Sequence, residues 1–486
     1  MSDKYLVKGK YLPTIGVECH VQLKTKTKLF SGVSNDARDA EPNTLISPIC
    51  LGFPGTLPVL NQESIHLAVK AGLALRAEIA NVSHFDRKHY FYPDLPKGYQ
   101  ITQFERPIVG KGVVEAPLGG GEFVSVGITR AHLEEDAGKS SHPSGADYSL
   151  VDLNRAGTPL LEIVSEPDIH NAAEAKAYAH ELYLLMKYAG VSDVDLYHGN
   201  MRFDVNVSVS DNPQKLGTRS ETKNLNSFKS VEKAVEFEIN RQIELLEKGQ
   251  KVVQETRGWD DAKQKTISQR SKEDAHDYRY FPDPDLPPIE VEQEYIDRQL
   301  DSMPTMPSAL RSLFGSLGMT EAQIDTIIEE PEMSDILRQI LDQKDPKTAK
   351  IVGNWLTGEL QRLITDGEIN LKQIAAVTNQ MVKLASMLDG AMLSSTAAKE
   401  VLAVVVKTGQ DPEDVAKSKN LLQVSDESEL VMIVEQVISE NEKAADDVRN
   451  GEMKAIGFLV GQVMKLSQGR ANPAKVQELI KKQLGV

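Results

Sequence analysis

The chain of 486 residues has little cysteine and no long apolar run. Its two cysteines, Cys19 and Cys50, are too few for a disulfide framework and favour a reduced, cytosolic protein. No apolar stretch follows the charged N-terminus, and no run of about 18 apolar residues occurs. We therefore expect a cytoplasmic protein with no signal peptide, no membrane-spanning segment and no membrane partner.

Several catalytic signatures are also missing. The chain has no G-x-x-x-x-G-K-[ST] loop, which excludes a P-loop enzyme, and the glycines at 119–121 are typical of a hairpin turn. Cys19 alternates onto the apolar face of a predicted strand, which argues against a nucleophile. Ser140 and Ser141 are weak grounds for an amidase. The chain therefore shows neither a P-loop nor a convincing Cys or Ser nucleophile.

The charge is unevenly distributed. The formal net charge of −16 argues against generalised phosphate binding. From Gly451 onward, however, six basic residues stand against two acidic ones, a local excess of 6 − 2 = +4. This end of the chain is either a solvated helix face or a place where nucleic acid docks, and charge alone does not separate the two.

The hydrophobic pattern changes near residue 290. Before it, short alternating runs broken by Gly, Pro, Asn and Asp predict strands joined by turns. Helices are predicted at 61–79, 171–189 and 230–248. Residues 281–288 contain four prolines, which predicts a rigid extended linker.

Beyond the linker the apolar stripes are helical, and they are interrupted near 409–412, where Asp411 is placed to cap the next helix. We predict an α+β protein with a sheet-containing domain at 1–294, a helical domain at 295–408 and a small helical tail domain at 409–486.

One predicted strand, residues 15–23, has a mixed polar face. Ile15, Val17, Cys19, Val21 and Leu23 alternate with three polar residues, Glu18, His20 and Gln22. A carboxylate and an imidazole two residues apart point the same way, which suits a divalent cation. Taken alone, the pair is more typical of an exposed edge strand.

Two further stretches contain acids in unusual settings. Glu134, Glu135 and Asp136 follow one another, which describes either a charged turn or a set of oxygen ligands for Mg²⁺ in a cleft. Glu162 interrupts the apolar run 160–164. A carboxylate in such a run is costly to bury unless it is paired or bound to a metal, so we expect Glu162 to have a cationic partner.

A fourth stretch alternates cleanly between polar and apolar residues. Its polar face is formed by Arg202, Asp204, Asn206 and Ser208, and it lines a cavity or faces water. Shortly after it, Lys223 is accompanied by the amides Asn224 and Asn226, a set that suits a phosphate or substrate contact.

These motifs, in this order, resemble one family, the B subunits of aspartyl/glutamyl-tRNA amidotransferase (GatB). The most specific is D-x-N-R-x-G-x-P-L-x-E at 152–162, followed by S-E-P at 165–167. The others are G-x-E-x-H at 16–20, D-R-K-x-Y-F-Y-P-D at 86–94, H-L-E-E-D-A-G-K at 132–139, K-N-L-N-S at 223–227, D-Y-R-Y-F-P at 277–282, G-F-L-V-G at 457–461 and A-N-P at 471–473.

The resemblance implies a cradle-shaped catalytic domain with a mixed sheet, then a helical domain and a YqeY-like tail domain that holds tRNA. It implies a ligase of translation that amidates misacylated Glu-tRNA(Gln) or Asp-tRNA(Asn). ATP would convert the side-chain carboxylate to an acyl phosphate, with Mg²⁺ as cofactor. Ammonia would come from glutamine through an amidase subunit (A), in a heterotrimer with a small subunit (C).

The resemblance also assigns residues. Those that match the family's metal cluster are Glu18, His20, Glu134, Glu135 and Glu162. Lys88 and Lys97 match positions near the ammonia route, with Glu135 at its mouth, so we expect the catalytic residues Glu135, Glu162, Lys88 and Lys97. The predicted nucleotide or substrate contacts are Asn154, Arg155, Arg202, Asp204, Asn206, Lys223 and Asn226.

One feature departs from the family pattern. Many relatives carry a four-cysteine zinc knuckle between the first strand and the first helix. Here Ser31, Val33 and Ser47 stand at three of the ligand positions and only Cys50 remains. Because one thiolate cannot hold a structural zinc ion, we expect none.

Two other hypotheses remain open. A non-catalytic tRNA-binding scaffold is one, although acidic groups close to tRNA would repel its phosphates without a metal. A free-standing ligase is the other, and the missing ammonia-generating site argues against it.

Overall fold

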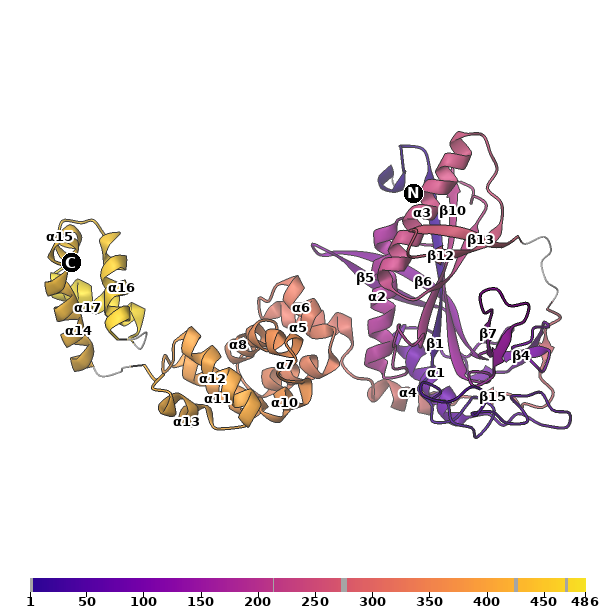
Figure 1. The fold of residues 1–486 in the computed structure, drawn as a ribbon, viewed down its shortest axis with the longest axis horizontal. Coiled ribbons are helices and arrows are strands. Elements are labelled where there is room, and N and C mark those ends of the chain that lie inside the picture. Colours follow the sequence, from indigo (N-terminus) through magenta and orange to yellow (C-terminus); the bar gives the residue numbers. More distant parts are fainter. Residues whose placement is uncertain (1–2, 213, 272–277, 424–426, 468–470) are drawn as a thin grey trace. The chain divides into compact units, whose positions relative to one another are not determined.

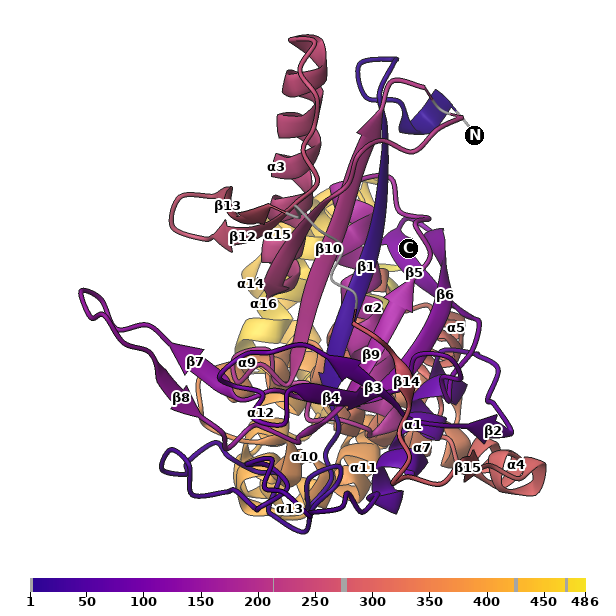
Figure 2. The same ribbon diagram turned by 90° about the vertical axis from the view of Figure 1, so that its right-hand side faces the viewer.

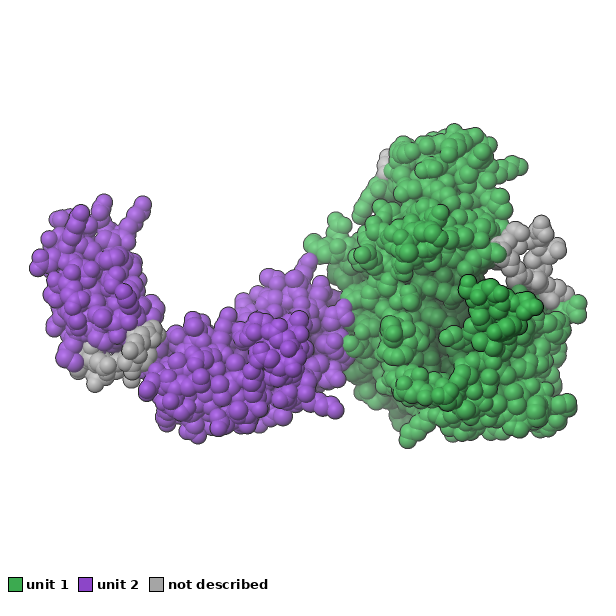
Figure 3. Space-filling model, viewed as in Figure 1, with its two compact units in different colours: residues 1–307 green, residues 308–486 purple. Residues whose placement is uncertain are grey.

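The computed structural model describes residues 3–212, 214–271, 278–423, 427–467 and 471–486. The chain divides into two compact units, residues 1–307 and 308–486, which Figure 3 colours separately. Among the described helices, none combines the length and the apolar character needed to cross a membrane.

A large mixed sheet forms the centre of the first unit (Figures 1 and 2). Its 11 strands run in the order β13-β12-β11-β10-β1-β9-β6-β4-β3-β14, and β5 pairs with β6. Described neighbours are antiparallel except for β11 and β12. The strands are β1 Leu12–Gln22, β3 Asp86–His89, β4 Tyr99–Thr102, β5 Gly112–Gly119, β6 Glu122–Glu135, β9 Pro159–Ser165, β10 Met201–Ser210, β11 Ser220–Leu225, β12 Glu255–Asp260, β13 Lys265–Ser271 and β14 Phe281–Pro282. The turn between β5 and β6 is the hairpin predicted at 119–121.

The two central strands alternate as predicted. In β1 the side chains of Ile15, Val17, Cys19 and Val21 are buried in the main hydrophobic core, and the residues between them are part-exposed. In β10 the apolar side chains from Phe203 to Val209 join the same core. Because side chains alternate along a strand, the opposite face of the sheet receives the polar residues of both strands.

Three helices cover the apolar face: α1 Gln62–Ala74, α2 Ala172–Ala189 and α3 Phe228–Glu247. Each begins at a polar N-cap residue whose side chain accepts a hydrogen bond from a backbone N–H of the first turn, and these caps are Asn61, Asn171 and Ser227. The first helix was predicted to reach residue 79, and it ends earlier. Arg76 adopts a left-handed φ of 51°, and Ile79 forms a β-bridge with Val109.

The proline-rich stretch was predicted to be an extended linker, and this is only partly confirmed. It turns at residues 284–286, and both of its ends pair with strands of the first unit. Phe281–Pro282 (β14) pairs with β3, and β15 (Ile289–Glu290) pairs with β2 (Val82–Ser83). The following helix α4 (Gln293–Asp301) places Ile296 in the main core. These contacts extend the first unit to Pro307, beyond the position where the sequence placed the end of its first domain.

The remaining short elements of the first unit are η1 Asp3–Tyr5, β7 Lys139–Ser141 and β8 Leu150–Asp152, of which β7 and β8 pair with each other.

The described elements of the second unit are helices. They are α5 Pro307–Ser316, α6 Glu321–Ile328, α7 Pro331–Gln343, α8 Pro346–Leu356, α9 Glu359–Thr365, α10 Leu371–Ala376, α11 Thr378–Asp389, α12 Ser395–Thr408, α13 Pro412–Ser418, α14 Glu427–Glu440, α15 Glu442–Arg449, α16 Ala455–Leu466 and α17 Pro473–Leu484. Asp411 caps α13 as predicted, accepting from the backbone N–H groups of Glu413 and Asp414. Helices α14 to α17 share a hydrophobic core of their own. Arg470, one of the basic residues of this end, lies outside the described residues.

A buried ion network joins α3 to the edge of the sheet. The Glu238 carboxylate is fully buried and accepts from Ser220 Oγ at 2.7 Å, from Arg241 Nη2 at 2.7 Å and from Thr266 Oγ1. Arg257 Nε lies 3.0 Å from its Oε1. Burial alone would raise the pKa of Glu238, but these donors, Arg241 first, outweigh burial and lower it.

We expect Glu238→Gln to reduce the free energy of unfolding of the first unit by about 3 kcal/mol, because it removes the buried carboxylate that Arg241 and Arg257 share and leaves Glu255 as their remaining acidic partner. Urea unfolding followed by Trp259 fluorescence in a Trp355→Phe background measures this. Since the folded-state pKa of Glu238 is lowered, its contribution is complete above pH 5 and is lost as the pH falls below about 4.

Glu236→Gln is the matched control, because Glu236 lies two residues away on the same helix in an exposed pair with Lys233. It should change the unfolding free energy by less than about 0.5 kcal/mol. Equal effects of the two substitutions would show that the buried network does not stabilise the unit.

Candidate functional site

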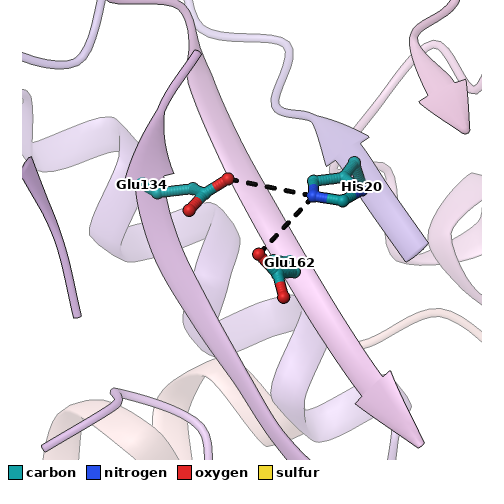
Figure 4. A group of neighbouring side chains, drawn as sticks. All are labelled: His20, Glu134 and Glu162. Carbon is teal, nitrogen blue, oxygen red and sulfur yellow. Dashed lines mark ion pairs between the residues drawn. The ribbon is translucent and has the colours of Figure 1, made fainter. Parts of the chain in front are cut away.

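Strand register brings four titratable side chains together on the polar face of the sheet. In the β1–β9 pairing His20 lies opposite Glu162, and in the β6–β9 pairing His132 lies opposite Glu162. Glu134 is two residues beyond His132 on β6 and therefore points to the same face. Figure 4 shows His20, Glu134 and Glu162 converging from these three strands.

The distances within this cluster are short. His20 Nε2 lies 3.5 Å from Glu162 Oε2 and 3.9 Å from Glu134 Oε1. His132 Nε2 lies 3.5 Å from Glu162 Oε2 and 3.7 Å from Glu134 Oε2. We call these four residues the two-histidine cluster. Glu134 and His132 are buried, and the side chains of His20 and Glu162 are 20% and 15% exposed.

The electrostatics of this cluster are those of paired opposite charges. Burial acts to lower the pKa of His20, but the hydrogen bond and charge of Glu162 outweigh it and raise that pKa to about 9. Burial raises the pKa of Glu162, but His132 and His20 overcome this effect and the pKa is lowered. The pKa of Glu134 is lowered too, because His132 and Lys88 outweigh burial and the charge of Glu162. The carboxylates are therefore ionised at neutral pH.

These residues fit a divalent cation. Ligand atoms of His20, Glu134 and Glu162 all lie within 4.8 Å of one another. Two neighbouring ligands about 2.1 Å from an octahedral cation lie roughly 3–4 Å apart, which is the range of the observed separations. Two carboxylates suit Mg²⁺, and the imidazole makes the set suitable for Mn²⁺ as well.

His132 belongs to this cluster, although it was not among the predicted site residues. Its Nδ1 is buried, with no hydrogen-bond partner among the described residues. The signal in the sequence was its spacing of two residues from Glu134, the same spacing that singled out Glu18 and His20.

Glu18 joins a second acidic group on the neighbouring strands. It lies opposite Asp204 in the β1–β10 pairing, and Asp204 and Glu221 lie within ligand distance of it. Burial and the charge of Glu162 raise the pKa of Glu18. The structure therefore places Glu18 beside the two-histidine cluster, in a separate group of carboxylates.

The predicted substrate contacts on β10 and β11 surround this second group. Asn206 Nδ2 donates to Glu18 Oε1 at 2.9 Å. Lys223 Nζ lies 2.9 Å from both Asp204 Oδ2 and Glu221 Oε1, and these carboxylates outweigh burial and raise its pKa. Asn226 is exposed, just beyond the end of β11.

Glu135 turns away from its neighbour Glu134. It forms an ion pair with Lys97, and its Oε1 accepts from the backbone N–H of Ile101 at 2.9 Å. Glu135 and the Lys97 side chain are almost completely buried. The structure thus brings together Lys97 and Glu135, two of the three residues predicted along the ammonia route, and it does not bring Glu135 into the two-histidine cluster.

Lys88 lies near the two-histidine cluster among aromatic rings. Burial lowers its pKa, but the charges of Glu134 and Glu162 outweigh burial and raise it. Its Nζ lies 5.0 Å from the ring centre of Tyr278 and 5.8 Å from that of Tyr90. Asp277, the first residue of the motif at 277–282, lies outside the described residues.

Arg155 and Arg202 meet at Asp136, the third of the consecutive acids. Arg155 Nε lies 3.1 Å, and Arg202 Nη2 3.2 Å, from Asp136 Oδ2. Asn154 has a different position. Its Oδ1 accepts from the backbone N–H of Leu45 at 2.8 Å and its Nδ2 donates to the carbonyl of Glu41 at 2.8 Å, so it holds the loop before α1.

Cys50 lies in a polar cluster that does not fit a structural zinc ion. Ser47 Oγ lies 3.2 Å and Ser31 Oγ 4.0 Å from its Sγ. Lys28, which is fully buried, points its Nζ at the same sulfur at 3.5 Å and donates to the carbonyl of Leu45 at 2.7 Å. One thiol, two hydroxyls and an ammonium are not a zinc donor set.

Comparisons with known proteins identify the same family along nearly the whole chain. The model of the GatB/GatE catalytic domain matches residues 13–297, and that of a second GatB domain matches residues 335–484. Three similar proteins are each named as the B subunit of an aspartyl/glutamyl-tRNA(Asn/Gln) amidotransferase. The one from Carboxydothermus hydrogenoformans is 44% identical over 98% of this chain and 99% of its own length. Those from Caldanaerobacter subterraneus and Trichodesmium erythraeum are 46% and 43% identical, over 98% and 100% of this chain and 99% and 100% of their own lengths.

Proposed function

The chain belongs to the GatB/GatE family, and from this premise we propose that the two-histidine cluster is where it activates the side-chain carboxylate of an aminoacyl-tRNA. The chain is one component of a glutamine-dependent ligase that uses ATP to amidate Glu-tRNA(Gln) or Asp-tRNA(Asn) in translation. Such a component works with other subunits and with tRNA. The finer composition, a heterotrimer with an amidase subunit (A) and a small subunit (C), is part of the proposal.

The proposed chemistry has two steps. An oxygen of the side-chain carboxylate attacks the γ-phosphorus of ATP, the bond from that phosphorus to ADP breaks, and an acyl phosphate forms. Ammonia then attacks the acyl carbon, the bond to phosphate breaks, and the amide forms with release of phosphate and one proton.

Within this scheme His20, Glu134 and Glu162 would hold a divalent cation, which would neutralise charge on the transferring phosphoryl group. Their separations of 3.5 and 3.9 Å and the ionised state of both carboxylates support this role. Lys88 adds a fixed positive charge beside them, which favours two approaching anions. We assign the nucleotide contacts to Lys223 and Asn206, which lie beside Glu18 and Glu221.

The ion pair of Lys97 and Glu135 supports an entry point for ammonia that is distinct from the two-histidine cluster. A carboxylate beside that entry can accept the proton that an ammonium ion must lose before its nitrogen becomes a nucleophile. The tail at 409–486 is proposed to hold tRNA, with its exposed basic residues near α16 and α17. The cellular location and the absence of zinc stay predictions.

The observation that carries this proposal is the strand register that gathers two imidazoles and two carboxylates on one face of the sheet. A scaffold that only bound tRNA would gain nothing from ionised carboxylates beside its ligand's phosphates. The cluster therefore favours the catalytic role over the scaffold.

An isotope-transfer experiment tests the proposed chemistry. The complex with its partner subunits is given ATP, glutamine and Glu-tRNA(Gln) whose side-chain carboxylate carries ¹⁸O. We expect one ¹⁸O atom in each phosphate released, measured by mass spectrometry, because the acyl phosphate passes one carboxylate oxygen to phosphorus. Amidation without ATP, or release of unlabelled phosphate only, would contradict the proposal.

A further inference from the structure

A further cluster of a histidine and two acids lies at the start of β3. His84 precedes this strand, Asp86 is its first residue, and Glu105 follows the end of β4 by three residues. One ligand atom from each of the three lies within 4.8 Å of the other two. We call these residues the β3 cluster. The proposed function gives none of them a role.

Strand register separates the β3 cluster from the two-histidine cluster. Asp86 lies opposite Thr102 in the β3–β4 pairing, and Thr102 lies opposite Glu134 in the β4–β6 pairing. Neighbouring strands lie about 4.8 Å apart, so the backbone of Asp86 is about 10 Å from that of Glu134. Two metal ions that act on one substrate lie about 3.5–4 Å apart. An ion in the β3 cluster would therefore occupy a site of its own.

Asp86 is buried and its carboxylate is held in one orientation. Its Oδ2 accepts from the backbone N–H groups of Phe104 at 2.9 Å and Glu105 at 3.1 Å. The other oxygen, Oδ1, lies 3.2 Å from His84 Nε2. Hydrogen bonds to the second oxygen are the means by which proteins fix a carboxylate that binds a metal.

The Nε2 atom of His84 is buried and has no hydrogen-bond partner within the described part of the chain. It nevertheless lies 3.2 Å from Asp86 Oδ1 and 3.8 Å from Glu105 Oε2. Atoms this close that are not aligned for a hydrogen bond are typical of ligands of one ion, because their lone pairs point at the ion. A buried polar atom without a partner is costly, and a bound cation would remove that cost.

The donor set favours Zn²⁺. This ion binds imidazole nitrogen and carboxylate oxygen at about 2.0–2.2 Å in tetrahedral geometry, so its ligands lie roughly 3.2–3.6 Å apart. The separation of His84 and Asp86 is in this range, and the Glu105 side chain, which is 68% exposed, can rotate into it. Water would fill the fourth position on that exposed side. Mg²⁺ prefers six oxygen ligands, whereas imidazole suits Zn²⁺.

We infer that the β3 cluster is a Zn²⁺ site that fastens the segment after β4 to the start of β3. That segment contains Phe104, whose ring stacks on Tyr280 with the ring centres 3.9 Å apart. Tyr278, two residues before Tyr280, has its ring centre 5.0 Å from Lys88 Nζ. The ion would thus hold the aromatic side chains near Lys88 in place. The predicted absence of zinc concerned the four-cysteine knuckle, with which the β3 cluster shares no residue.

Zn²⁺ titration of the full-length chain in complex with its partner subunits tests the inference. Saturating Mg²⁺ is present, and a chromogenic chelator competes for Zn²⁺. His84→Gln removes the nitrogen ligand, and Glu105→Gln removes the exposed carboxylate. The matched control is His89→Gln, because His89 lies on the same strand but stacks on Phe281, outside the cluster. The partner subunits are the same throughout, so differences between variants report this chain alone.

The wild-type and control complexes should each bind one Zn²⁺ more than the His84→Gln complex. Glu105→Gln should weaken binding of that ion at least about tenfold. Since Glu105 is exposed, this variant should unfold at the wild-type temperature when Zn²⁺ is absent, which separates loss of the ligand from loss of the fold. Anomalous diffraction at the zinc edge should place a peak about 2.0–2.1 Å from His84 Nε2.

Equal Zn²⁺ binding by wild type and His84→Gln would overturn the inference, and so would an anomalous peak at the two-histidine cluster alone. Displacement of the ion by Mg²⁺ would overturn the assignment to zinc. An equal loss in His89→Gln would show a diffuse effect of changing this strand and would overturn it as well. The inference does not depend on the proposed function, because none of these measurements involves amidation.

Discussion

Glu162→Gln should lower amidation of Glu-tRNA(Gln) by at least about 1,000-fold, even with free ammonia as the nitrogen donor. Glu162 lies opposite both His20 and His132 and forms two of the four ion pairs in the two-histidine cluster. Glutamine keeps the size of the side chain but cannot neutralise two imidazoles or bind a divalent cation as a carboxylate does. A 1,000-fold loss corresponds to about 4 kcal/mol of transition-state stabilisation.

A second measurement separates loss of the cation from loss of the fold. Mn²⁺ binding to the purified complex, followed by electron paramagnetic resonance, should weaken at least about tenfold in Glu162→Gln. The control is Glu232→Gln, which removes a carboxylate on α3 that pairs with Lys176 at 3.0 Å and lies outside the cluster. Full activity of Glu162→Gln with ammonia, or unchanged Mn²⁺ affinity, would refute the assignment.

Glu135→Gln should reduce amidation with glutamine far more than amidation with free ammonia. We expect glutamine-dependent amidation to fall by about 100-fold, in the range of a lost proton acceptor. Amidation with saturating ammonia should stay within about threefold. The physical reason is the position of Glu135, which is buried against Lys97 and the Ile101 amide and turned away from the cluster. The ratio of the two rates in one preparation is the measurement.

The exposed ion pair of Arg76 and Glu115, 3.1 Å apart, provides the control for this experiment. Glu115→Gln should leave the ratio unchanged. An equal fall with both donors in Glu135→Gln would mean that Glu135 takes part in carboxylate activation, as the resemblance to the family's metal cluster also allowed. Glutaminase activity of the amidase partner should remain in either case.

Much of this arrangement could be predicted from alternation along single strands. The polar faces of β1 and β10 were evident because each apolar neighbour had to enter the core. Which of Glu134, Glu135 and Asp136 joins His20 was not evident, since three consecutive acids point to alternating faces and only the pairing of β6 with β9 selects one. His132 was missed for the same reason, because its partner Glu162 lies on another strand.

Other features depended on contacts that are distant in sequence. The early end of α1 follows from the bridge of Ile79 to Val109, which no helical pattern encodes. The proline-rich stretch was predicted to be an extended linker, but it contains a turn, and its pairing with β2 and β3 involves residues about 200 positions away. The wall of the polar cavity of about 620 Å³ at the end of β1 likewise joins loops near residues 24, 38 and 198 to Lys139 of β7. Composition had indicated only an acidic chain with a basic end.

Strand β1 has a consequence for how this protein tolerates change. Along its central stretch the residues belong alternately to the hydrophobic core and to the two groups of charged side chains, and it pairs on both edges, with β9 and β10. A slip of one residue would exchange the two sets completely. A substitution in this stretch therefore alters either the core or the charged groups. A molecule that misaligns the strand loses both its fold and its activity. Variation that adapts the enzyme to new tRNAs should therefore accumulate in the loops around the strand, while its central stretch stays fixed.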